Sequence, residues 1–565
     1  MAISCISVLM SDFRKPVLFL LLVLQVYWWP AAAQEHKTAS MAHQLLSTRG
    51  EVIIRFVKPN NIEIAELTRF LSIDNYSGDT ITAYANRSGF NRFLELHIPF
   101  EVIQPHSLKK TSSSTGEALT WAYPAYGSYI SLMQQYASTY PDLCRLHDFG
   151  SSVNGHRLLA LKISDNPLQE ENEPVIFYTA SMHGDEPLGY VLMLQLIDSL
   201  LTGYNSSNFL KQLIDGAEIW INPIANPDGA YFISDLSVEG GTRFNSNQVD
   251  LNRDFPVIGS ASWDTIGRQP ETIAMLRFLD EIRPLLSANF HSGVEVVNYP
   301  WDSWVSKHAD DSWYKFISHG YADTAQAHSP PGYMDFMNDG ITRGIEWYEV
   351  YGGRQDFVNY YLNGREVTIE LSDNKIPLQH ELDDYWKYNR HSLLHFMSYA
   401  FTGFKGIVTD SATGEPLSAR IRLLNYDYDN SFVFSKSDGN YFRLLNPGTY
   451  KVVITAPGYK YKLTEATVQS GELTPLDAEL SKDFELSLFP NPFGNYVKLN
   501  IPYSGYNLEV TFINQKGQKI RVVSHFVRSS GPQEIPVGEL SPGFYIIHVR
   551  YNDQTWNLTG IKFNH

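Results

Sequence analysis

Residues 175–201, VIFYTASMHGDEPLGYVLMLQLIDSLL, join a short apolar run to a long apolar segment through the polar turn SMHGDE. The short run VIFYTA has the length and the β-branched and aromatic composition of a buried strand. Pro187 follows the turn at a position that the first turn of a helix tolerates, and the apolar residues up to Leu201 predict a buried helix. This stretch therefore predicts one strand–turn–helix unit of an α/β domain.

The same alternation extends over residues 119–402. Apolar runs at residues 219–224, 285–290 and 367–371 have strand length, and helix-length segments separate them. We therefore predict that residues 119–402 form an α/β domain. In open sheets of this kind, ligands bind beyond the carboxyl ends of the strands.

Two segments precede this domain. Residues 1–33 have the order of a secretory signal peptide, with Arg14 and Lys15 before an apolar run and alanines at 31–33 as the cleavage site. An uncleaved membrane anchor is the alternative, although the apolar run is short for a bilayer. Residues 34–118 predict a small α+β domain, which fits either a lasting domain or a removable pro-segment. Its expected strands are residues 51–57, 79–84 and 100–103, and its expected helix is residues 62–71.

The pattern changes again after the α/β domain. Strand-length alternating runs are separated by turn sequences such as SDGN at residues 437–440, which predicts all-β structure. A break near residue 482 divides this part into two all-β modules, residues 403–482 and residues 483–565.

Composition excludes several classes of protein. With 43% apolar and 19% charged residues, the chain of 565 residues is too hydrophobic to be disordered. Its net charge of −17 argues against nucleic acid or an anionic membrane surface as a partner. Cys5 and Cys144 are the only cysteines, so a disulfide framework is excluded. After cleavage of the signal peptide we expect no membrane span in the mature chain.

Metal-ligating residues follow the predicted strands. His183 and Glu186 stand in the turn after the first strand, and His291 follows the run at residues 285–290 directly. Two histidines and a carboxylate are the ligands of many catalytic zinc sites, which also need a general base beside the metal. Glu370 lies near the end of the strand at residues 367–371 and could be that base. Taken alone, each of these residues more often has a structural role. Three strands that all end in the required residue types nevertheless favour a catalytic zinc site.

The stretches around these residues resemble the zinc metallocarboxypeptidases, and among them the subfamily that trims C-terminal Lys and Arg. The matching stretches, in the order of the family, are MHGDE (182–186), NPDG (226–229), RFNSNQVDLNRDFP (243–256), NFHSG (289–293) with VVNYPWD (296–302), WYEVYGGRQDF (347–357) and VTIELSDNKIP (367–377). The resemblance implies a mixed sheet with helices on both faces and one Zn²⁺ per peptidase domain.

The resemblance also implies a role for individual residues. His183, Glu186 and His291 would hold the zinc ion, and Glu370 would activate the metal-bound water. Arg243 would stabilise the oxyanion. Asn252 and Arg253 would clamp the terminal carboxylate of the substrate, and Tyr348 would close over it. A guanidinium group suits this clamp because it binds a carboxylate through two parallel hydrogen bonds.

Specificity depends on Asp302, which stands where the Lys- and Arg-trimming enzymes have an acidic residue. A buried carboxylate selects a basic side chain, since an apolar one would leave the charge unpaired. Gln355 would line the same pocket. The alternative is that Asp302 is a solvated loop residue. The chain departs from the subfamily at Ser292, Glu295 and Arg354, and the last two are expected to reshape the pocket.

The C-terminal modules carry resemblances of their own. Residues 406–424 and 437–459 are similar to the transthyretin-like β-sandwich that follows many such peptidases. Residues 488–501 and 540–563 are similar to the sorting domain of the Bacteroidetes type IX secretion system. With the signal peptide, this implies the bacterial secretion machinery as a partner and a secreted or cell-surface protein. An ordinary adhesive β module is the alternative for the last part.

Together these features predict a secreted zinc carboxypeptidase that acts on peptides or proteins with a free C-terminus, preferably after Lys or Arg. One alternative is a zinc peptidase of broader or cell-wall peptide specificity. Another is a catalytically silent surface binding protein. Glycoside hydrolysis by paired carboxylates would leave the arginine and histidine positions unexplained.

Overall fold

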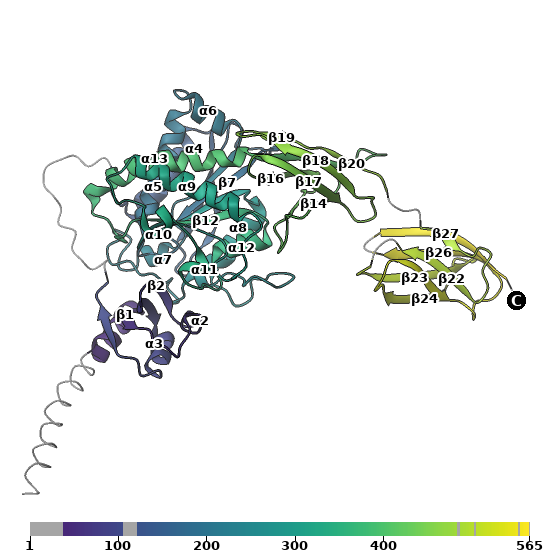
Figure 1. Cartoon of the computed structure of the whole chain (residues 1–565), viewed down its shortest axis with the longest axis horizontal. Helices are drawn as coiled ribbons and strands as arrows, with labels where there is room; N and C mark the ends of the chain where they lie inside the picture. The colour runs from purple at the N-terminus through teal and green to yellow at the C-terminus, as the bar shows by residue number, and fades with distance from the viewer. Residues whose placement is uncertain (1–37, 106–120, 483–485, 502–503, 552–553, 564–565) are drawn as a thin grey trace, which may run out of the picture. The chain divides into compact units, whose positions relative to one another are not determined.

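The computed structural model describes residues 38–105, 121–482, 486–501, 504–551 and 554–563. The predicted signal peptide lies outside these ranges. Within them, every helix is too short or too polar to cross a bilayer. The chain divides into two compact units, residues 1–401 with 428–431 and residues 402–427 with 432–565, and each is described by itself (Figure 1).

The first unit is built on an eight-stranded mixed sheet, as predicted. The four strands at its centre run parallel, and two more strands extend the sheet on each side. Both strands on one side join in antiparallel pairs; on the other side the inner strand joins antiparallel and the outermost strand pairs with it in parallel. The strand order across the sheet is β11 (Ile341–Arg343), β10 (Glu295–Tyr299), β12 (Arg365–Leu371), β9 (Leu286–His291), β7 (Val175–Ala180), β8 (Glu218–Asn222), β6 (Arg157–Ile163) and β5 (Cys144–Ser151).

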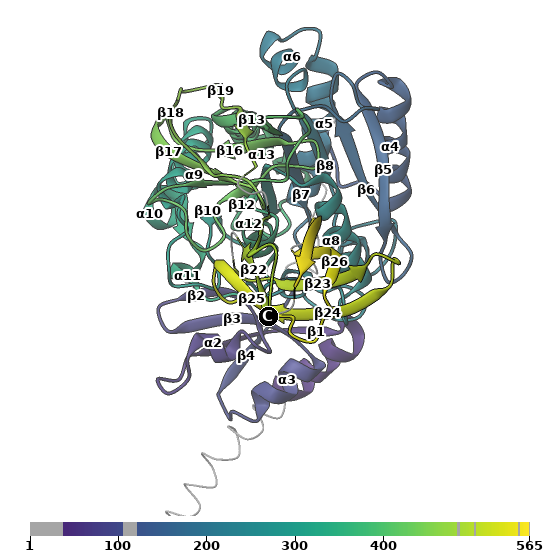
Figure 2. The ribbon, with the colours of Figure 1, turned by 90° about the vertical axis from the view of Figure 1, so that its right-hand side faces the viewer.

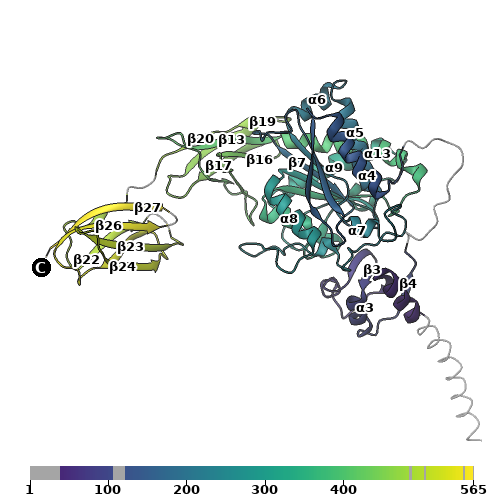
Figure 3. The same cartoon turned by 180° about the vertical axis from the view of Figure 1, so that it is seen from behind.

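Helices cover both faces of this sheet, as Figure 3 shows. One layer consists of α4 (Tyr126–Thr139), α5 (Leu188–Gly203), α9 (Asp311–Ala327) and α13 (Leu382–Ser398); the other includes α8 (Pro270–Ile282) and α12 (Arg354–Tyr361). The alternation along β7 explains the two layers, because successive side chains of a strand point to opposite faces. Phe177 packs edge-on against Phe278 of α8, whereas Tyr178 contacts Phe396 of α13. The α/β prediction is therefore confirmed.

The N-terminal α+β domain, described over residues 38–105, has an antiparallel sheet in the order β2-β3-β1-β4. A helix over residues 38–49 comes first, followed by β1 (Glu51–Val57), α2 (Ile64–Leu67), β2 (Ser72–Ser77), β3 (Thr80–Asn86), α3 (Arg87–Leu94) and β4 (Phe100–Ile103). The expected helix at residues 62–71 is shorter, because the chain turns into β2, a strand that the sequence pattern did not predict.

This small sheet has two apolar faces. Side chains such as Ile54 and Phe56 pack with Phe90 and Phe93 of α3 in the domain's own core. Ile53 and its strand neighbour Tyr84 point the other way and pack against Phe244 of the α/β domain. The sheet thus lies between its own helices and the α/β domain, as Figure 2 shows.

The second unit contains only strands among its described residues. Residues 403–480 form two small sheets, with the orders β16-β13-β19 and β15-β14-β17-β18; β20 also pairs with β13. Residues 488–562 form two more, with the orders β21-β22-β25 and β24-β23-β26-β27. Each half buries a separate hydrophobic core, one over residues 404–480 and one over residues 486–551. The bounds are β13 (Gly403–Asp410), β14 (Arg420–Leu423), β15 (Val433–Phe434), β16 (Asn440–Leu444), β17 (Gly448–Thr455), β18 (Lys462–Val468), β19 (Leu473–Pro475), β20 (Ala478–Leu480), β21 (Leu488–Phe489), β22 (Tyr496–Ile501), β23 (Asn507–Asn514), β24 (Lys519–Phe526), β25 (Gly531–Pro536), β26 (Gly543–Tyr551) and β27 (Gln554–Lys562).

Candidate metal centre and active site

The turn after β7 is held in one conformation by its neighbours. The hydroxyl of Ser181 donates to the carbonyl of Glu186 at 3.1 Å, which closes the turn on itself. The amide of Asn226 donates to the carbonyl of Met182 at 3.2 Å. Gly184 lies so close to Gly229 that a Cβ atom there would be 2.1 Å from the backbone of Gly229. The glycine is therefore required, and the turn fixes the directions of the side chains that flank it.

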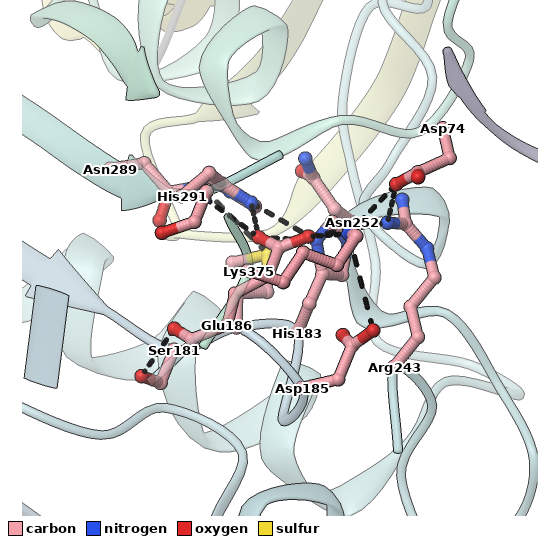
Figure 4. A network of polar contacts seen from close by, with 12 residues as sticks. Asp74, Ser181, His183, Asp185, Glu186, Arg243, Asn252, Asn289, His291 and Lys375 are labelled. Carbon is pink, nitrogen blue, oxygen red and sulfur yellow. Dashed lines mark hydrogen bonds and ion pairs between the residues drawn. The ribbon is translucent and has the colours of Figure 1, made fainter. Parts of the chain in front are cut away.

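His183, Glu186 and His291 converge above the edge of the sheet, as Figure 4 shows. Nδ1 of His183 and Nδ1 of His291 lie 3.1 Å and 2.9 Å from Oε2 of Glu186, and 3.0 Å from each other. These separations are close to the edge of roughly 3.3 Å in a tetrahedron with ligands about 2 Å from the metal. All three side chains are buried. The donor set therefore fits a zinc ion.

The second nitrogen of each histidine ring also has a polar neighbour. Nε2 of His183 lies 3.2 Å from Oδ1 of Asp250, and Nε2 of His291 lies 2.8 Å from the side-chain amide of Asn289. The carboxylate of Asp250 can accept from Nε2 of His183, which fixes the orientation of that ring and leaves Nδ1 free to bind a metal; the amide of Asn289 fixes the orientation of the His291 ring. Burial, reinforced by His183, lowers the pKa of His291 to about 4, so this ring is neutral at physiological pH, as a ligand must be.

Glu370 lies beside this group. It pairs in register with His291 on the neighbouring parallel strand. Within the described residues its Oε2 atom is buried and has no hydrogen-bond partner. Burial, followed by the charge of Glu186, raises the pKa of Glu370 well above its ordinary value. A carboxylate in this state is well suited to accept a proton.

Arg243 also lies beside the candidate metal ligands. Its Nε donates to Oδ2 of Asp250 at 2.9 Å, and its Nη1 lies 3.6 Å from Oε1 of Glu186. The guanidinium is almost fully buried. It therefore presents a fixed positive charge beside the metal ligands.

Asn252 and Arg253 lie in the short helix η2 (Leu251–Arg253), which Asp250 caps by accepting from the amide of Asn252 at 2.9 Å. Of the Arg253 side chain, only Nη1 donates a hydrogen bond within the described chain, to the carbonyl of Asn252 at 2.9 Å. Its Nε and Nη2 atoms are buried without a hydrogen-bond partner among the described residues. Buried guanidinium donors without a partner are rare, so this pair indicates a site for an anionic group.

A single pocket joins these groups. Tyr348 and Asp302 also line it. Tyr348 directly follows α11 (Gly344–Trp347), and its burial raises the pKa of its hydroxyl to about 12. The structure thus brings together nine of the ten residues that the sequence analysis selected.

Asp302 is buried, which excludes the alternative of a solvated loop residue. Its Oδ1 accepts from Asn298 at 3.0 Å and from Gln355 at 2.9 Å. Gln355, the tenth residue, therefore supports the carboxylate from behind and does not line the pocket. Burial, followed by the nearby charge of Asp356, raises the pKa of Asp302 well above its ordinary range.

Two expectations about the pocket were wrong. Arg354 does not reshape it, because its side chain is fully buried elsewhere and binds Glu366 through two bonds of 2.9 Å. Glu295 does not line it either; its carboxylate accepts from the backbone of Met334 at 3.2 Å.

Two charged residues at the site escaped the sequence analysis. Lys375 donates from Nζ to Oε1 of Glu186 at 2.5 Å, and lies 2.8 Å from Oδ1 of Asp74. Asp74 belongs to β2 of the N-terminal domain and also lies 3.5 Å from Nη1 of Arg243 (Figure 4). Lys375 could have been found from the sequence, because it stands only five residues after Glu370. No nearby motif in the sequence indicates Asp74.

Family models match three parts of the chain. Residues 129–392 match the zinc carboxypeptidase model, and residues 403–481 match the carboxypeptidase regulatory-like domain. Residues 487–561 match the secretion system C-terminal sorting domain, which indicates secretion or the cell surface. The resemblances to a zinc carboxypeptidase, to the β module that follows such peptidases and to a secretion sorting domain are therefore confirmed.

Similar proteins include carboxypeptidase SOL1 of Arabidopsis thaliana, 34% identical over 382 residues, which are 66% of this chain and 75% of the relative. The carboxypeptidase N catalytic chain of Mus musculus is 33% identical over 401 residues, which are 64% of this chain and 87% of the relative. Carboxypeptidase D of Homo sapiens is 36% identical over 357 residues; the match covers 60% of this chain and only 25% of that longer protein.

Replacement of His291 by alanine tests the ligand set. We expect wild-type protein to retain about one zinc ion per chain after dialysis, and His291→Ala to retain well under half of that, since three protein ligands hold a catalytic zinc. The exposed His380 provides the control His380→Ala. Metal analysis of the dialysed proteins measures both. Full zinc content in His291→Ala would contradict this assignment.

Proposed function

The chain belongs to the zinc carboxypeptidase family, and we propose that it removes C-terminal Lys or Arg from peptides and proteins outside the cell. The observation that carries the specificity is the buried carboxylate of Asp302 in the pocket that Arg253 also lines. The general activity follows from the family, and the residues below are assigned to its steps.

An exopeptidase must first recognise a free C-terminal carboxylate. Nε and Nη2 of Arg253 supply two donors for it, and their lack of partners in the described residues supports this role. Asn252 is the second member of this clamp. Its Oδ1 is held by the amide of Arg354 at 3.0 Å, which fixes the side chain. Tyr348 lines the same pocket and covers the bound end of the peptide.

His183, Glu186 and His291 are the residues that would hold zinc. When bound there, zinc polarises the scissile carbonyl and lowers the pKa of a water molecule. Glu370 accepts the proton that this water loses and delivers it to the departing amino group. Burial raises the pKa of Glu370, which makes it a stronger base for the first transfer, and the proton that it takes up is then available for the second. Arg243 stabilises the negative charge that develops on the carbonyl oxygen.

The side chain of the leaving residue enters the part of the pocket where Asp302 lies. Burial raises the pKa of this carboxyl group, so its charged form is costly in the free enzyme. A Lys or Arg side chain offsets that cost by pairing with the carboxylate, whereas Phe or Leu leaves it unpaired. Gln355 and Asn298 hold the carboxylate in place. The presence of a complete zinc-binding set and base favours this activity over a silent binding protein.

Replacement of Glu370 by glutamine separates metal binding from chemistry. We expect Glu370→Gln to keep its zinc but to lose about 10²–10⁴-fold in kcat, the usual contribution of a general base. The exposed Asp373, three residues away, gives the control Asp373→Asn. Metal analysis and initial rates on a blocked dipeptide ending in Arg measure the two properties. A variant that keeps its kcat would remove Glu370 from the mechanism.

Replacement of Asp302 by asparagine tests the specificity. Asn still accepts from Asn298 and Gln355 but carries no charge, so kcat/KM for a C-terminal Arg should fall about 100-fold while that for Phe is unchanged or rises. Glu295→Gln is the control, since Glu295 is acidic and near but outside the pocket. If Asp302→Asn keeps the preference for Arg, the basic specificity has another origin.

A further inference from the structure

Arg243 lies in a long segment without helices or strands. Residues 231–250 connect α7 (Pro227–Ala230) to η2. Such a segment lacks the hydrogen-bond ladder that orders regular structure, so its conformation depends on contacts with its surroundings. Both the α/β domain and the N-terminal domain supply such contacts. In the α/β domain, Gly229 accepts from the amide of Thr242 at 2.8 Å, and Glu271 accepts from the side chain of Asn245 at 3.0 Å. The N-terminal domain adds contacts on both sides of Arg243.

Arg49 and Glu51 make the first two contacts. The guanidinium of Arg49 donates to the carbonyl of Gly240 at 3.1 Å and to that of Gly241 at 2.7 Å. Oε2 of Glu51 accepts from the backbone amide of Arg243 at 2.9 Å. Both side chains are almost fully buried. The backbone immediately before Arg243 is thus bound by the N-terminal domain at three points.

Further contacts continue along the segment. Asn86 donates to the carbonyl of Gln248 at 2.9 Å. Tyr84 packs edge-on against Phe244 and donates from its hydroxyl to Oδ2 of Asp185 at 2.5 Å. Without the N-terminal domain, the buried carboxylate of Asp185 would lose this bond, and its Oδ1 already has no partner among the described residues.

Asp74 extends the contact to the side chain of Arg243 itself. Its carboxylate lies between Nη1 of Arg243 and Nζ of Lys375, two cations that otherwise both approach Oε1 of Glu186. The carboxylate of Asp74 pairs with both cations, so Arg243 and Lys375 compete less for the carboxylate of Glu186. Tyr348 also packs against the hydrophobic core of the N-terminal domain. The pocket nevertheless remains a cavity, with Asp74 as part of its wall.

We propose that the N-terminal domain is a lasting part of the peptidase, and that Arg49 and Glu51 are positioning residues that hold Arg243 at the active site. The domain orders the backbone of residues 240–248 and balances the charges beside the metal ligands. The chain is therefore active with this domain in place. The catalytic role of Arg243 in this inference rests on the proposed function. The ordering of residues 240–248 by the N-terminal domain does not.

Variants of the intact chain test both parts. We expect Glu51→Ala and Arg49→Met to raise amide hydrogen exchange in residues 240–248 at least about tenfold, since local order there depends on these side chains. For a blocked dipeptide ending in Arg, kcat should fall about tenfold or more with KM changed less than about twofold, because Arg243 acts in the transition state. Arg55→Met is the control; Arg55 is exposed on the same strand. Unchanged exchange, or a rise in kcat, would overturn the proposal.

Cleavage between the domains gives an independent test that does not depend on any buried substitution. A site for a specific protease is inserted between residues 110 and 111, and the purified chain is cut there without denaturation. We expect the two fragments to elute together and the activity to be retained. Release of the N-terminal fragment with a rise in activity would overturn the proposal. If the intact chain does not cleave the peptide, the proposed function fails, and the exchange measurements still decide this inference.

Discussion

The structure depends on three neighbouring parallel strands that end at one edge of the sheet. β7, β9 and β12 run in the same direction, and their register places Glu370 beside His291 and Ala180 beside Phe290. The turn after β7 then carries His183 and Glu186 over the same edge. Parallel strands can bring together residues far apart in the chain in this way because each crossover returns to the same end of the sheet. The residues proposed as metal ligands and as the base therefore need no long or flexible segment to meet.

Burial of so many ionisable groups makes charge balance the second constraint. A buried charge is costly unless it is paired, and two of the cations at this site contact an anion. Lys375 contacts Glu186, and Arg243 contacts Asp250. Three groups depart from this balance within the described residues. Two donors of Arg253 and Oε2 of Glu370 have no hydrogen-bond partner, and the buried carboxyl group of Asp302 is bonded by neutral amides and by no cation. In the proposed function, Arg253 and Asp302 bind the two charges of a peptide that ends in Lys or Arg.

The sequence could predict the parts of the site that local patterns determine. Strand ends followed by His or Glu marked the metal ligands, and apolar runs predicted β7, β8, β9 and β12 to within a few residues. Contacts between distant segments left no such mark. Asp74 reaches Arg243 only because β2, an unpredicted strand, packs its sheet against the α/β domain. The prediction that Arg354 reshapes the pocket was also wrong. Its side chain pairs with Glu366 because of the way α12 packs on β12, and the place of a residue in a motif does not determine where its side chain points.

The most direct test of the account compares two blocked dipeptides, one ending in Arg and one in Phe, as substrates of the intact wild-type chain, with and without a zinc chelator. The account predicts that Arg is released much faster than Phe and that the chelator abolishes both activities. Faster release of Phe would contradict the role of Asp302. Release that is unaffected by the chelator would contradict the zinc mechanism itself.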